Sequence, residues 1–145
     1  MNYLCACTAL AVAILATSPA TSAQETVAIS ADIAAVVTGG SWSSGAINGV
    51  YRVVVRTGGR EHTISSVQVD WIAESNSHDG EPRVVQSRIA NTGSWLLIQP
   101  RILRSGSVWR VELDGLETHF TPAVRGKWTL RLGAPGEIQS TVVTR

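Results

Sequence analysis

An acidic pair and a histidine in the C-terminal third of the chain could carry acid–base or metal chemistry. Residues 114–115, an Asp-Gly pair, predict a two-residue turn, because both central residues of a type I′ turn need positive φ. In that hairpin Glu112 faces Glu117, and Arg110 faces His119. Facing carboxylates repel, so they bind a cation, share a proton or are screened by a neighbouring charge. We favour screening by Arg110 on a solvated sheet face over a metal site or an acid–base pair.

A second polar group lies in the segment His78-Asp79-Gly80-Glu81, between two predicted strands. Its imidazole and carboxylates could hold a metal, but the composition is also that of an ordinary turn. We therefore predict a loop in which His78, Asp79 and Glu81 are candidates for contact with a partner. Trp42 is the other contact candidate, because its neighbours in residues 39–45 are Gly and Ser.

The familiar sequence patterns of enzymes and metal sites do not occur. The chain has no G-x-S-x-G elbow, no H-E-x-x-H pair and no EF-hand loop, and both of its cysteines lie in residues 1–23. We therefore predict no catalytic residue, no metal site and no cofactor. The formal net charge of +1 gives no general attraction to nucleic acid or to anionic lipid, and no stripe of alternating aromatic and basic residues is present.

The elements that must position these residues are strands. Apolar and polar residues alternate with a period of two and are interrupted by Gly, Asn-Gly, Asp-Gly and Pro, which favours an antiparallel sandwich or barrel. We expect an all-β antiparallel sandwich of about 8–9 strands, immunoglobulin-like or related. The predicted strands are residues 50–57, 67–73, 83–89, 95–99, 108–113, 116–120, 127–132 and 137–143, with one or two more in 26–37.

Two further dipeptides predict turns: Asn-Gly at residues 48–49 and Gly-Gly at residues 58–59. The first would bring Trp42 opposite Val55. The second gives a register that slips by one residue near 65–66, which indicates a β-bulge or a strand break there. Four tryptophans continue apolar stripes or open an apolar strand, so we expect them in the core rather than at a ligand: Trp71, Trp95, Trp109 and Trp128.

The N-terminal residues have the pattern of a secretory signal peptide. Residues 4–16 are apolar but too few to cross a bilayer as a helix, and residues 17–23 are small and polar. We expect cleavage after Ala23, with Ala20 as the near alternative. Residues 4–7 resemble a lipoprotein box, but they precede the apolar segment instead of following it. Residues 24–145 then form one cysteine-free domain, with no transmembrane segment.

These features favour a periplasmic or secreted binding module without catalytic activity. We expect a protein or glycan partner outside the cytoplasm, such as an envelope protein, a glycan or a subunit of an assembly, and no nucleic acid. One alternative is a small hydrolase using Glu112, Glu117 and His119, which would have to converge in a concave pocket. Another is a secreted inhibitor or a structural envelope component, which would present a protruding loop or an unpaired sheet edge.

Overall fold

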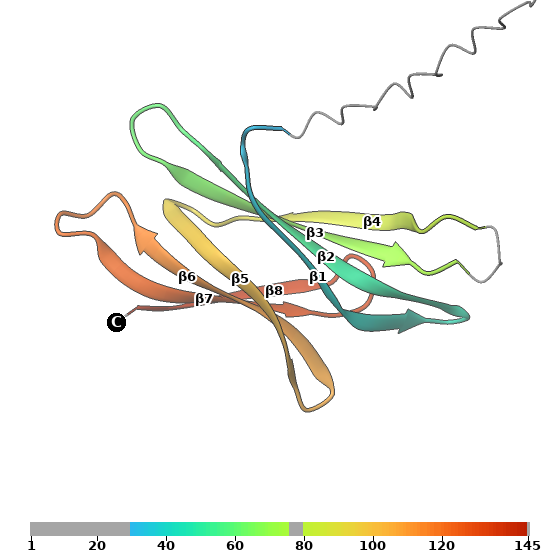
Figure 1. Ribbon diagram of the computed structural model, residues 1–145. Coiled ribbons are helices and arrows are strands. Elements are labelled where there is room, and N and C mark those ends of the chain that lie inside the picture. The colour runs from blue at the N-terminus through green and yellow to red at the C-terminus, as the bar shows by residue number, and fades with distance from the viewer. Residues whose placement is uncertain (1–29, 76–79, 145) are drawn as a thin grey trace, which may run out of the picture.

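The computed structural model describes residues 30–75 and 80–144, and in these ranges the chain is all β, without a helix. Eight strands form two antiparallel four-stranded sheets, which lie one above the other in Figure 1. The all-β class and the two antiparallel sheets agree with the sequence prediction. The first sheet contains β1 (Ile33–Ser44), β2 (Ile47–Gly58), β3 (Ile64–Ala73) and β4 (Arg83–Ala90). The second contains β5 (Trp95–Ser105), β6 (Val108–Glu117), β7 (Val124–Leu132) and β8 (Ile138–Thr144).

Each sheet is a simple meander of consecutive strands. The spatial orders are β1-β2-β3-β4 and β5-β6-β7-β8, so every hydrogen-bonded neighbour is also a neighbour in the sequence. Immunoglobulin sandwiches instead contain Greek-key connections between their sheets. The immunoglobulin-like type that the sequence suggested is therefore not confirmed.

The core lies between the inner faces of the sheets, the faces that each sheet turns toward the other. Strand alternation puts every second side chain on this face, and paired residues on adjacent strands share it. Val53 pairs with Val69, and Leu113 pairs with Trp128. The buried inner-face residues include Tyr51, Val53, Val55, Val67, Val69 and Trp71 in the first sheet, and Trp95, Leu97, Val111, Leu113, Trp128, Leu130 and Leu132 in the second.

The turn predicted at residues 114–115 is wrong, because β6 runs straight through it. Gly115 pairs with Leu97 on one side and with Gly126 on the other. The indole of Trp95 lies over both glycines: an added Cβ would come within 2.9 Å of Trp95 Cε3 at Gly115 and within 2.6 Å of its Cη2 at Gly126. Gly115 therefore leaves space for the indole of Trp95 and does not form a turn.

The turn predicted at residues 48–49 is wrong for the same reason. The β1–β2 turn comes earlier, at Gly45 with φ 60°, and Gly49 lies in β2 beside the ring of Trp42. A Cβ at Gly49 would be 2.7 Å from Trp42 Cζ2. Trp42 therefore pairs with Gly49 instead of Val55.

A reversal does follow residues 58–59, but as a longer loop than predicted. β2 ends at Gly58 and β3 begins at Ile64, so residues 59–63 connect them. The register then runs without a shift from Gly58–Ile64 to Gly49–Ala73. The predicted bulge near residues 65–66 is absent from this ladder, because the longer loop restores the register that a two-residue turn would have broken.

Four of the five tryptophans are buried. Burial is confirmed for Trp71, Trp95 and Trp128, whereas Trp109, near the start of β6, is only partly buried. Trp42 is 6% exposed and its Nε1–H donates to the carbonyl of Val50 at 3.0 Å, so it is mainly a packing residue. The Gly and Ser neighbours of Trp42 do not expose its ring, because Gly49 provides the space into which the ring packs.

A buried carboxylate stabilises the outer, solvent-facing side of the first sheet. Asp70 is fully buried there and accepts hydrogen bonds from Gln68 Nε2 at 2.7 Å and Ser87 Oγ at 2.6 Å. Arg52 Nη2 lies 2.8 Å from Asp70 Oδ2. Burial disfavours the charged form, but these hydrogen bonds and the Arg52 charge outweigh it and lower the pKa of Asp70.

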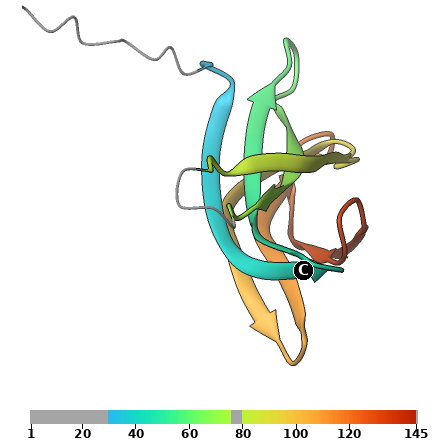
Figure 2. The same ribbon diagram turned by 90° about the vertical axis from the view of Figure 1, so that its right-hand side faces the viewer.

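The two long sides of the sandwich differ. On one side β1 runs along β5, and Figure 2 shows these two strands side by side. A Cβ at Gly40 would lie 3.0 Å from Trp109 Cδ2, which shows how closely β1 approaches the second sheet. On the other side β4 and β8 make few contacts. The sandwich is therefore closed at β1 and β5 and more open at β4 and β8.

Candidate functional site

The structure separates the residues of the predicted charged cluster. Because β6 is continuous, Glu112 and Glu117 do not face each other across a hairpin. Glu112 lies on the outer face of the second sheet, whereas Glu117 ends the inner-face row and accepts a hydrogen bond from Ser94 Oγ. His119 is exposed in the loop after β6, where its ring lies 5.0 Å from that of His62, centroid to centroid. Phe120 follows His119 in the same loop and is 60% exposed.

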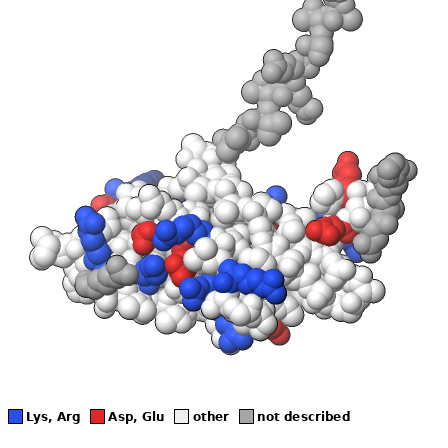
Figure 3. Space-filling view, turned by 60° about the horizontal axis from the view of Figure 1, so that its bottom comes forward, with Lys and Arg blue, Asp and Glu red and all other residues white. Residues whose placement is uncertain are grey.

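Arg110 and Glu112 do meet, as predicted, and a lysine joins them. Arg110 Nη2 is 2.9 Å from Glu112 Oε1, and Lys127 Nζ is 3.2 Å from Glu112 Oε2. The hydrogen bond from Lys127 and the two neighbouring charges lower the pKa of Glu112. A carboxylate held between two cations stays ionised, and Glu117, with which it was expected to share a proton or a cation, lies on the opposite face of the sheet. Figure 3 shows basic and acidic side chains mixed on this face. Glu112 itself is only 9% exposed, so the expectation of a fully solvated carboxylate is wrong: the side chains of Arg110 and Lys127 cover it.

The predicted contact loop is only partly visible. His78 and Asp79 lie outside the described residues, and Glu81 is exposed just before β4. The structure therefore gives no test of a site formed by these three residues together.

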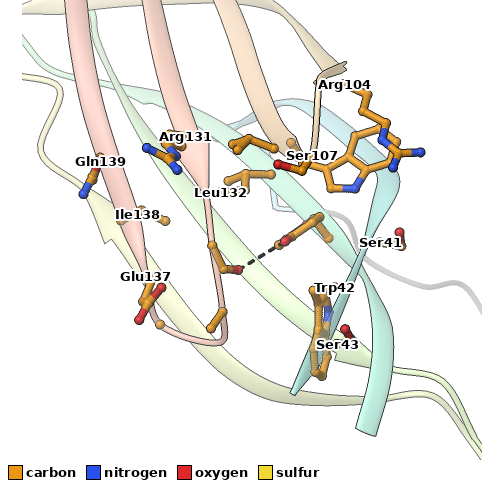
Figure 4. A pocket seen from close by; sticks show the side chains of 16 residues that line it. Ser41, Trp42, Ser43, Arg104, Ser107, Arg131, Leu132, Glu137, Ile138 and Gln139 are labelled. Carbon is orange, nitrogen blue, oxygen red and sulfur yellow. Dashed lines mark hydrogen bonds between the residues drawn. The ribbon is translucent and has the colours of Figure 1, made fainter. Parts of the chain in front are cut away.

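A cleft opens at the end of the sandwich where the β1–β2, β5–β6 and β7–β8 connections meet. Its volume is about 830 Å³, within the range of clefts that take small ligands. Figure 4 shows Ser41, Trp42 and Ser43 on one side and Glu137, Ile138 and Gln139 on the other. We call this space the end cleft; its lining is Ser41, Trp42, Ser43, Tyr51, Arg104, Ser107, Val108, Trp109, Arg131, Leu132, Gly133, Ala134, Gly136, Glu137, Ile138 and Gln139.

Two buried aromatic donors fix the wall of the end cleft. Tyr51 Oη and Trp71 Nε1 each donate to the carbonyl of Gly133 at 3.1 Å, and their rings meet edge to face with centroids 6.1 Å apart. Burial raises the pKa of Tyr51, so its hydroxyl keeps the proton that it donates. The β7–β8 connection is closed further by a bond from Gly133 N to Glu137 O at 3.0 Å. This wall is therefore rigid and anchored in the core.

An arginine stacked on a tryptophan forms the most distinctive part of the end cleft. Arg104 and Trp109 pair across the β5–β6 hairpin, and the guanidinium carbon lies 5.7 Å from the ring centroid. Arg104 Nε also donates to the carbonyl of Gly106 at 3.1 Å. Stacking and this bond orient the guanidinium and leave its other N–H groups available to a ligand. The site can therefore offer a cation beside an aromatic surface.

The polar groups that line the end cleft include hydroxyls, an amide, two guanidinium groups and one carboxylate. Its lining contains serine hydroxyls but no histidine, cysteine or aspartate to activate them, and Glu137 is its one carboxylate. Across residues 30–75 and 80–144, no group of three or more His, Cys, Asp or Glu side chains is placed to hold a metal ion. The same part of the chain contains no helix long and apolar enough to cross a membrane.

Sequence reasoning missed Arg104 and misjudged Trp109. The signal was present in Ser105-Gly106-Ser107, which lies between them and contains the real turn, with Gly106 at φ 62°. A hairpin about this glycine places Arg104 opposite Trp109. The Asp-Gly pair at 114–115 is the stronger turn signal in the sequence, so the turn was assigned there and the one at Gly106 was missed.

Comparison of the chain with protein-family models, with curated proteins and with solved structures finds no match. The end cleft must therefore be interpreted from its own chemistry.

Proposed function

We propose that this chain is an exported, non-catalytic binding module that takes a carboxylate-bearing glycan segment in the end cleft. The observation that carries the proposal is the Arg104–Trp109 stack, a preoriented cation beside a partly buried aromatic ring at the rim of the cleft. A guanidinium recognises carboxylates through paired N–H donors. Export is supported by the signal-like pattern of residues 1–23 and by the lack of cysteine after it.

The remaining polar groups of the lining suit a ligand with many hydroxyls. Ser41, Ser43 and Ser107 supply hydroxyls that can donate and accept, and Gln139 supplies an amide. Arg131 adds a second cation, so the lining carries two positive groups against the single carboxylate of Glu137. Hydroxyls with a carboxylate are the combination that uronic acid sugars present. A neutral sugar would leave Arg104 without its partner.

The test is a titration of the purified protein with a short oligogalacturonate and with its neutral galactose counterpart, followed by calorimetry. We expect saturable binding of the acidic oligosaccharide and weaker binding of the neutral one. Arg104→Gln should weaken acidic binding by about 10- to 100-fold, the usual range for a hydrogen bond between charged groups. Arg101→Gln is the matched control, because Arg101 lies on the same strand but on the outer face, bridged to Asp114 at 3.4 Å.

Three results would contradict the proposal. Failure of both sugars to bind would remove the glycan assignment. Equal affinity for the acidic and the neutral sugar would show that Arg104 reads no carboxylate. An equal loss of affinity in Arg104→Gln and Arg101→Gln would place recognition on overall charge instead of in the end cleft.

A further inference from the structure

A sandwich of two open sheets has four edge strands, here β1, β4, β5 and β8. An edge exposes unpaired backbone N–H and C=O groups, and proteins that do not pair there interrupt it with charges, proline or bulges. β1 and β5 lie along each other, and the ladders of both contain register shifts, at Gly39/Trp42 and at Ile98/Arg101. β5 also contains Pro100 within its shift. These two edges are protected.

β4 is protected in another way. Arg83 and Arg88 lie on this strand, and its ladder with β3 is shifted between Trp71 and Ile72. A second β4 laid against it would bring arginines close to arginines. This strand is therefore a poor template for pairing with a copy of itself.

β8 has none of these protections. Residues 138–144 carry no charge and no proline, and their register with β7 runs without a shift from Leu132–Ile138 to Gly126–Thr144. Every residue after Ile138 is exposed. Val142, on the inner face, is 41% exposed, and Val143, on the outer face, is 57% exposed. β8 is thus a regular, uncharged edge strand that the described part of the chain leaves open.

We propose that β8 pairs antiparallel with β8 of a second copy of this chain, joining the two β5–β8 sheets into one. In any two-fold antiparallel pairing, opposite residues share a face. The outer-face set of β8 is Gln139, Thr141 and Val143, and the remaining residues form the inner-face set. Neither set contains a charge, so residues 138–144 meet their own copies without repulsion.

The basic residues of β7 do not oppose this pairing. Lys127 and Arg131 lie on the outer face of β7, one strand away from β8. In the joined sheet the two β7 strands would be three strand spacings apart, roughly 14 Å at about 4.8 Å each. That distance exceeds the Debye length at physiological salt, so their repulsion is largely screened. Whether two β8 strands pair therefore depends on the uncharged β8 edge and not on the charges of β7.

The experiment measures mass by light scattering after size exclusion over a concentration series. We expect the wild-type chain to approach twice the monomer mass, and Val143→Lys to remain at the monomer mass, because a lysine on an edge opposes pairing. Val36→Lys is the matched control: Val36 is also an outer-face valine on an edge strand and is 54% exposed, but its strand lies against β5. The control should dimerise like the wild type.

Amide hydrogen exchange of the wild-type chain gives a second readout that needs no variant. Amides of residues 138–144 should gain protection at the high end of the concentration series, whereas those of β1 should not. A wild-type chain that stays monomeric throughout would overturn the proposal and leave β8 to some other partner. A dimer that Val143→Lys leaves intact would overturn it as well, because the contact would then lie elsewhere.

Discussion

Substitution of Gly126 by Ala tests the packing of tryptophan on glycine. A Cβ at Gly126 would lie 2.6 Å from Trp95 Cη2 and 3.0 Å from the carbonyl oxygen of Val143, whereas ordinary contact begins at 3.4 Å. The indole cannot move away freely, because another atom of the same ring, Cε3, already lies against Gly115. The carbonyl belongs to the β8 backbone and is equally constrained. The ring or the strand must therefore shift by several tenths of an ångström.

Overpacking of this kind costs about 1–3 kcal/mol. Alanine also reduces the conformational entropy of the unfolded chain, which stabilises the folded state by about 0.4–1 kcal/mol. The expected net loss in the free energy of unfolding is about 1–2 kcal/mol. With a urea m-value of about 1–3 kcal/mol/M, the unfolding midpoint should fall by roughly 0.3–2 M. Unfolding should be followed by far-UV circular dichroism and not by tryptophan fluorescence, because the substitution itself changes the surroundings of Trp95.

Gly58→Ala is the matched control, because a Cβ at Gly58 meets nothing within 4 Å. Its unfolding midpoint should stay the same or rise slightly. A double-mutant cycle with Trp95→Leu then isolates the contact: Gly126→Ala should cost at least about 1 kcal/mol less once the ring is gone. If Gly126→Ala were as harmless as Gly58→Ala, or its cost did not depend on Trp95, the packing argument would be refuted.

Three further predictions concern burial and charge. Asp70→Asn should lower stability by about 1–3 kcal/mol at neutral pH, since a buried hydrogen-bonded charge is lost. The folded state lowers the pKa of Asp70, so the ionised side chain stabilises the protein above the ordinary carboxyl pKa. This stabilisation is lost as the pH falls through the pKa of Asp70 in the folded state. The free energy of unfolding in urea should therefore depend less on acid pH in the variant than in the wild type. Glu112→Gln should lower the free energy of unfolding by about 1–2 kcal/mol in the same assay, because Glu112 is only 9% exposed and loses its charge between Arg110 and Lys127. No measurable loss would mean that these ion pairs behave like exposed surface pairs. Trp71→Ala should cost about 3–5 kcal/mol and Trp109→Ala clearly less, since Trp71 is fully buried and Trp109 is not; equal losses measured by thermal unfolding would contradict this ranking.

The strands were predictable because burial imposes a period of two on their sequences. Residues 83–89 became β4 almost unchanged, and the stripe of Val67, Val69 and Trp71 is the inner face of β3. The connections were harder to predict, because a glycine has two uses that look alike in a sequence. It can permit positive φ at a turn, as Gly45 does, or it can leave room for a ring, as Gly126 does. Only the position of a distant tryptophan distinguishes the two uses.

The candidate site depends on those connections, and this explains why it was not found from the sequence. Once the turn was assigned to residues 114–115, Glu112 and Glu117 became an apparent pair, and Arg104 had no partner. With the turn at Gly106, Arg104 meets Trp109 and the acidic pair disappears. The end cleft also requires β7 and β8 to bring Gly133 beneath Tyr51, a contact between residues far apart in the chain. Local patterns carry no information about such a contact.

The meander order has a consequence for how the molecule could be divided. All strand-to-strand ladders lie within residues 33–90 or within residues 95–144, so the link at 91–94 interrupts none of them. Cleavage there would produce two fragments, each a complete four-stranded sheet with one apolar face. The side chain of Ser65 in the first fragment would still hydrogen-bond to the backbone of Leu97 in the second. Such fragments have a natural basis for reconstitution, because each lacks only the cover that the other supplies. The two sheets could therefore be produced as separate chains and mixed to restore the sandwich.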